Sequence, residues 1–125
     1  YINRKECNMD ERRTSKRLNI NLPAIFKNLD VDNGEEKSTV VNVSYGGIGF
    51  IVDVKVDVGQ HVELDVQLED EGVVCLQTVV VWISTDEDNA QEFAYGVRIL
   101  NFGCDDAERF IRFCDLRLYN PPAQY

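Results

Sequence analysis

The sequence has little of what catalytic and metal sites usually require. It contains one histidine, His61, and its four cysteines include no CxxC pair. A hydrolytic triad needs a histidine beside a nucleophile, and a structural zinc site needs closely spaced ligand pairs. No Walker-type phosphate loop is present either. We therefore expect no enzyme, no metal site and no bound cofactor.

Long apolar runs and disulfide patterns are also missing. The longest unbroken apolar run is Val79–Ile83, which is far too short to span a bilayer, so membrane insertion is not expected. The cysteine spacing does not match a disulfide framework. We interpret Cys75 and Cys114 as small core residues of a reduced, cytoplasmic protein. The chain begins at Tyr1 rather than Met, and we expect it to be part of a longer protein, with room for an upstream domain.

Positive charge is scarce and gathers at one end of a chain whose net charge is −9. Residues 1–20 carry six Lys or Arg against three Asp or Glu, and the other 105 residues carry seven against 19. A body this acidic repels a long polyphosphate chain, so binding to a nucleic acid polymer is not expected. The basic segment can still hold a small anion.

Strand signals recur along the acidic part of the chain. Strict alternation over His61–Glu69 predicts a half-buried antiparallel strand with His61 on its solvated face. Pro23 indicates an edge position or a bulge in the first strand. The remaining strands are expected at Asn19–Leu29, Lys37–Val43, Ile48–Val52, Val73–Ser84 and Phe93–Leu100.

One amphipathic helix is expected near the C-terminus, at about Asp105–Leu118. Asp105 and Glu108 form a variant of the capping box at its start. Its apolar face is expected to comprise Ala107, Phe110, Ile111, Cys114 and Leu118. About six antiparallel strands and one helix predict an all-β fold, a small closed barrel with a helix that plugs or flanks it. Residues 19–120 would form this domain, and residues 1–18 a flexible basic arm.

Two short segments carry the functional signal. Arg12–Arg17 holds four cations in six residues, and arginine pairs bidentately with phosphate or with the O6 and N7 edge of guanine. A solvated basic linker would look the same. Asn42–Gly47 places short polar side chains beside two glycines, which allow close approach of a ligand and a positive φ. An ordinary turn would look the same.

Together the two segments resemble the PilZ family, the bacterial receptor domains for cyclic di-GMP. That family carries RxxxR in an N-terminal arm and Asp/Asn-x-Ser-x-x-Gly on the barrel. Arg13 and Arg17 match the first motif, and Asn42, Ser44 and Gly47 match the second. The later strands, with Trp82 and Tyr95–Arg98, and the closing helix are similar too. The resemblance spans residues 12–118 and implies an antiparallel PilZ-type β-barrel of six to seven strands.

The resemblance also implies a ligand site. The arm arginines would grip phosphate and guanine, and the barrel motif would hydrogen-bond a guanine beside a turn that leaves room for it. Trp82 has two open interpretations, a wall against the ligand or a core residue. An arginine at position 12 implies a mutually intercalated ligand dimer, hence two ligands per domain. The expected ligand-binding residues are Arg12, Arg13, Arg17, Asn42, Ser44, Gly46, Gly47 and Trp82.

The implied function is that of a receptor that catalyses nothing. We expect ligand binding to order the arm and so to signal to a neighbouring domain or protein partner, in the control of motility or biofilm formation. The alternative is a PilZ-like adaptor that binds a protein and no nucleotide. A third hypothesis, an oligonucleotide-binding barrel, is disfavoured by the acidic body.

Overall fold

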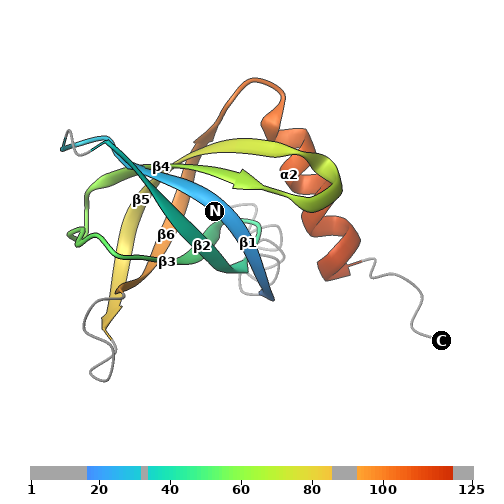
Figure 1. Cartoon of the computed structure of the whole chain (residues 1–125). Helices are drawn as coiled ribbons and strands as arrows, with labels where there is room; N and C mark the ends of the chain where they lie inside the picture. Colours follow the sequence, from blue (N-terminus) through green and yellow to red (C-terminus); the bar gives the residue numbers. More distant parts are fainter. Residues whose placement is uncertain (1–16, 32–33, 86–92, 120–125) are drawn as a thin grey trace, which may run out of the picture.

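A computed structural model of the chain describes residues 17–31, 34–85 and 93–119. In these residues six antiparallel strands close into a barrel, and one helix follows (Figure 1). The strand order around the barrel is β1-β2-β3-β6-β5-β4. The strands are β1 (Leu18–Asn28), β2 (Glu35–Val43), β3 (Gly47–Val52), β4 (His61–Gln67), β5 (Val73–Thr85) and β6 (Phe93–Phe102). The all-β prediction is confirmed.

Alternation along the strands builds the barrel interior. In β4, Val62, Leu64 and Val66 are fully buried, and the residues between them face outward. The strand is shorter than expected, because Glu69–Glu71 forms a 3-10 turn, η1. The prediction for His61 is confirmed, because it lies on the outer face. Its backbone N–H donates to Asp30 Oδ2 at 2.7 Å.

The barrel core is aromatic at its centre. The Phe50 ring lies 5.8 Å from Phe26 and 5.5 Å from Tyr95, between ring centroids. The Tyr95 hydroxyl accepts the N–H of Val56 at 2.7 Å and donates to the carbonyl of Val54 at 2.9 Å. Burial raises the pKa of this phenol. These bonds fix the connection that leaves β3, so the loop closes the barrel end without unpaired polar groups at Tyr95.

The first strand shows the irregularity that its proline predicts. The pairing of β1 with β2 shifts register between Asn19 and Leu22, which marks a bulge just before Pro23. The pairing of β1 with β4 begins only at Ala24. Pro23 therefore lies where no ladder hydrogen bond to β4 is needed.

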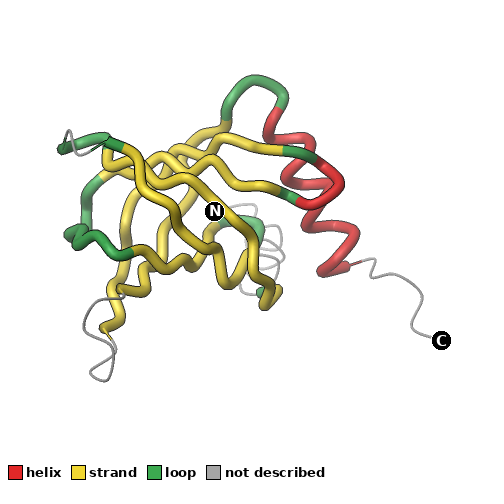
Figure 2. The backbone as a smooth tube through the Cα atoms, in the orientation of Figure 1, coloured by secondary structure: helices red, strands yellow, loops and turns green. Residues whose placement is uncertain are grey.

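The helix α2 (Asp106–Cys114) lies at one end of the barrel and continues as a π-helical turn, η2 (Asp115–Tyr119) (Figures 1 and 2). Phe110 packs 5.5 Å from Phe102 of β6, between ring centroids. The predicted apolar face is partly wrong: Ile111 is 42% exposed, whereas Phe113 is fully buried. None of the helices in the described part of the chain has the length and hydrophobicity to cross a membrane.

The predicted capping box at the start of α2 is wrong. Asp105 has a left-handed backbone, with φ of 63°, and its side chain makes no capping hydrogen bond. Asp106, the next residue, makes the side-chain contacts at the start of the helix instead. Its Oδ2 accepts the N–H of Cys75 at 2.8 Å, and its Oδ1 contacts Arg109. These interactions, the Cys75 bond first, lower the pKa of Asp106. They join the helix to β5.

The two cysteine predictions have opposite outcomes. Cys114 is fully buried in the core, as expected. Cys75 is only partly buried and lies on the outer face of the barrel, because its neighbours Val74 and Leu76 point inward. The interpretation of Cys75 as a core residue is therefore wrong.

Candidate ligand-binding site

A row of four register partners crosses the outer face of the barrel. Asn42 in β2 pairs with Gly49 in β3, Gly49 pairs with Gly96 in β6, and Gly96 pairs with Trp82 in β5. Directly opposed residues of antiparallel strands point to the same face of a sheet. The row therefore places the Asn42 and Trp82 side chains on either side of two glycines.

Both glycines are required by the side chains beside them. A Cβ on Gly49 would lie 2.5 Å from Asn42 Nδ2, and a Cβ on Gly96 would lie 2.0 Å from Trp82 Nε1. The amide and the indole thus lie flat against backbone. Sequence reasoning missed Gly49 and Gly96, although glycine inside a strand is a recognised sign of close approach.

The segment before β3 forms a turn closed by its own serine. The Ser44 hydroxyl accepts the N–H of Gly47 at 3.1 Å, and the Ser44 N–H donates to the Gly47 carbonyl at 2.9 Å. Ser44 is 2% exposed. Neither Gly46 nor Gly47 has a positive φ. Gly47 is needed for space, because a Cβ there would lie 2.7 Å from the Val97 carbonyl oxygen.

The turn is also attached to β6. The N–H of Ile99 donates to the Gly46 carbonyl at 2.9 Å. The Gly46 carbonyl is therefore used within the fold, and the turn is held on the sheet rather than projecting from it. A ligand that reaches this turn meets a surface whose backbone is already in place.

The structure brings residues of the two sequence segments together. Arg17, just before β1, donates from a guanidinium nitrogen to Asn42 Oδ1 at 2.9 Å, although 25 positions separate them. Arg17 is exposed. The other two predicted arginines, Arg12 and Arg13, lie outside the described residues. The outer face thus offers a guanidinium fork beside an amide at one end of the row and an indole at the other end.

The sequence matches the model of one family, the PilZ domain, over residues 11–116. This match covers most of the chain, including both segments that the structure joins through Arg17 and Asn42. The chain belongs to the PilZ domain family. No curated protein matches the sequence at a significant level.

Solved structures share the fold of this PilZ domain. The Bacillus subtilis inhibitor of motility, MotI/DgrA, superposes with a TM-score of 0.70 and 18% identity over 86% of this chain. This chain spans only 52% of that protein. The PilZ domain of Escherichia coli YcgR, with c-di-GMP, gives a TM-score of 0.61 and 19% identity, covering 82% of this chain and 87% of that one. These identities establish the fold alone.

Of the two interpretations of Trp82, the core role is wrong. The indole of the PilZ domain's single tryptophan is 41% exposed and rests on Gly96, on the outside of the barrel. Two strands, β3 and β6, separate it from Asn42 along the row. An exposed aromatic face beside polar groups is suited to stacking on a purine ring.

A further contact links the motif turn of the PilZ domain to its C-terminal end. The Tyr45 hydroxyl donates a hydrogen bond to the Asp115 carboxylate, the first residue of η2. Tyr45 lies between the predicted ligand residues Ser44 and Gly46. This contact therefore joins the motif turn to the turn that follows α2.

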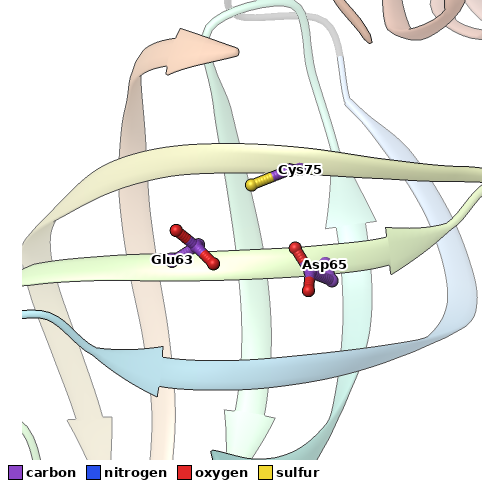
Figure 3. A group of neighbouring side chains, drawn as sticks. All are labelled: Glu63, Asp65 and Cys75. Carbon is purple, nitrogen blue, oxygen red and sulfur yellow. The ribbon is translucent and has the colours of Figure 1, made fainter. Parts of the chain in front are cut away.

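Potential metal ligands gather on a different part of the barrel. Glu63 and Asp65 of β4 and Cys75 of β5 have ligand atoms within 4.8 Å of one another (Figure 3). Burial, then a hydrogen bond with Asp65 and the charge of Glu63, raises the pKa of Cys75 to about 12. The thiol is therefore protonated at neutral pH, and a metal would have to displace that proton. Sequence reasoning missed this cluster because it placed Cys75 in the core.

Proposed function

We propose that this PilZ domain is a receptor for cyclic di-GMP and binds it on the outer face of the barrel, between Asn42 and Trp82. The observation that carries the proposal is the hydrogen bond between Arg17 and Asn42. It joins the two segments that PilZ domains use for this ligand. PilZ domains bind and regulate rather than catalyse, and the YcgR domain with c-di-GMP has the same fold.

The geometry suits the chemistry of the ligand, which has two guanines and two phosphodiesters and a charge of −2. Among the described residues, the Arg17 guanidinium bonds to a neutral amide and to no carboxylate, so an anion can replace the amide at small cost. Asn42 offers a donor and an acceptor to a guanine edge. Trp82 offers an indole face to a base. Ser44 acts mainly by holding the turn, since its hydroxyl is already bonded.

Arg12 and Arg13 complete the proposed site from the arm. Arg13 pairs with phosphate or guanine together with Arg17, and Arg12 supplies the charge for a second, intercalated ligand. Ordering of the arm then passes the signal to a neighbouring domain or a protein partner in the cytoplasm. Slower amide hydrogen exchange in residues 10–18 on addition of ligand is the expected sign. Unchanged exchange would contradict the arm mechanism but not the binding.

Isothermal titration calorimetry of cyclic di-GMP tests the receptor function. Wild type should bind saturably, with two ligands per domain, and should not bind GTP. Arg17→Ala should lose roughly ten- to a hundredfold in affinity, the usual effect of losing a bidentate arginine contact. Arg112→Ala is the matched control, because that arginine lies on α2 and faces Glu71. Absence of binding by folded wild type would refute the proposal and favour the protein adaptor.

A further inference from the structure

The described arginines divide into two groups by their partners. Three have a carboxylate partner: Arg109 with Asp106, Arg112 with Glu71, and Arg117 with Glu69. Arg17 bonds to the Asn42 amide and has no carboxylate partner among the described residues. Arg98 has neither an ion pair nor a side-chain hydrogen bond within the part of the chain that the structure describes. In a domain with such an excess of acids, the absence of an acidic partner at these two arginines distinguishes them.

Arg98 lies at the site already described. It pairs in register with Gly47 of β3 and with Val79 of β5, and it is exposed on the outer face. The residue after it, Ile99, donates its N–H to Gly46. Arg98 is therefore adjacent to the motif turn through the sheet itself.

The neighbours of Arg98 leave its side chain room on the side of the site. Across the strand pair lies Gly47, and two residues back on the same face lies Gly96, and neither has a side chain. The Trp82 indole rests on Gly96, so it lies on the same face of β6 as Arg98. A guanidinium that extends from Arg98 can thus reach the surface between the turn and the indole.

We propose that Arg98 is a further binding residue of this domain and contacts a phosphodiester group of the ligand from the barrel. This inference rests on the proposed function. The two phosphodiesters of a cyclic dinucleotide lie on opposite sides of its ring. Arg17 is placed to approach one of them, and Arg98, which is fixed on β6, to meet the other. Charge-assisted contacts to phosphate are the strongest that an arginine makes.

Calorimetry of cyclic di-GMP with Arg98→Ala, Arg98→Lys, Arg17→Ala and Arg112→Ala tests the inference at low and at high salt. Arg98→Ala should bind roughly ten- to a hundredfold more weakly than wild type, as loss of one charge-assisted hydrogen bond predicts. Its affinity should also vary less with salt, because one screened ion pair is gone. Arg98→Lys should retain most of the affinity, and Arg112→Ala should match wild type. Thermal unfolding of Arg98→Ala should be unchanged, since the side chain has no partner among residues 17–31, 34–85 and 93–119.

The outcomes separate this inference from the receptor proposal. If Arg17→Ala weakens binding but Arg98→Ala matches wild type at both salt concentrations, Arg98 is not a ligand contact and the receptor function stands. If Arg98→Lys is as weak as Arg98→Ala and neither changes the salt dependence, a charge contact is refuted. If wild type does not bind, the proposed function fails and this inference fails with it.

Discussion

Replacement of Gly96 by alanine tests how Trp82 is held at the site. A Cβ at position 96 would lie 2.0, 2.2 and 2.6 Å from three atoms of the indole. Carbon atoms in contact are normally about 3.5–4.0 Å apart, so the ring has to move by roughly 1.5 Å. The backbone cannot yield easily, because Gly96 pairs with Gly49 on one side and with Trp82 on the other.

The size of the effect follows from the cover that the indole loses. The ring is 41% exposed, so more than half of it is covered. If the displaced ring loses roughly 50 Å² of apolar cover, the free energy of unfolding falls by about 1–1.5 kcal/mol at 25 cal/mol per Å². Binding of cyclic di-GMP should weaken as well, because the stacking surface has moved.

The assay uses the single tryptophan of the chain. In Gly96→Ala the emission maximum of Trp82 should shift to longer wavelength, and urea unfolding followed by circular dichroism should show the lower stability. The control is the same change in a Trp82→Ala background, where the clashing partner is gone and the cost should fall below about 0.5 kcal/mol. Wild-type emission and stability in Gly96→Ala, or an equal cost in both backgrounds, would refute the packing of Trp82 on Gly96.

Three further predictions concern the rest of the fold. The hydrogen bond from Cys75 lowers the pKa of Asp106 below 3.8, so its contribution is present above that pH and is lost as the pH falls through the lowered pKa. Asp106→Asn should therefore cost about 1–3 kcal/mol in thermal unfolding at neutral pH and much less in acid. An equal cost at both pH values would contradict this. Tyr45→Phe removes the bond to Asp115, so hydrogen exchange in residues 115–119 should become faster, and unchanged exchange would exclude the link. Burial and the neighbouring acids raise the pKa of Cys75 to about 12, so it should react with iodoacetamide more slowly than exposed Cys104 in peptide mass spectrometry, and equal rates would contradict the raised pKa.

Much of the fold could be predicted because strand alternation is a local signal. Apolar residues at every second position of β4 must face one side, so the pattern alone assigns Val62, Leu64 and Val66 to the core. The errors arose where a tertiary contact decides the outcome. Asp105 lacks its capping role because Asp106 bonds to β5, a contact between residues 31 positions apart. Cys75 was assigned by residue type, whereas the alternation of Val74 and Leu76 would have placed it outside.

The candidate site could be predicted only in part, because strand register is not visible in the sequence. The two motifs were identified by their spacing, and the contact between Arg17 and Asn42 agrees with their grouping. The roles of Gly49 and Gly96 depend on which residues of other strands lie opposite them, and no pattern in the chain specifies that. The role of Arg98 could not be predicted for the same reason, since it depends on the residues opposite Arg98 in the sheet.

The row across the sheet accounts for the two glycines that stand inside strands of the proposed site. An outer face normally carries a side chain at every second residue of each strand, which leaves no gap as wide as a purine. Here the two central positions of the row, Gly49 and Gly96, have no side chain, and those at its ends, Asn42 and Trp82, lie flat against them. Either glycine replaced by a larger residue would raise its neighbour off the sheet. Glycine, which destabilises a strand, is therefore explained at both positions by the side chain that lies flat on it.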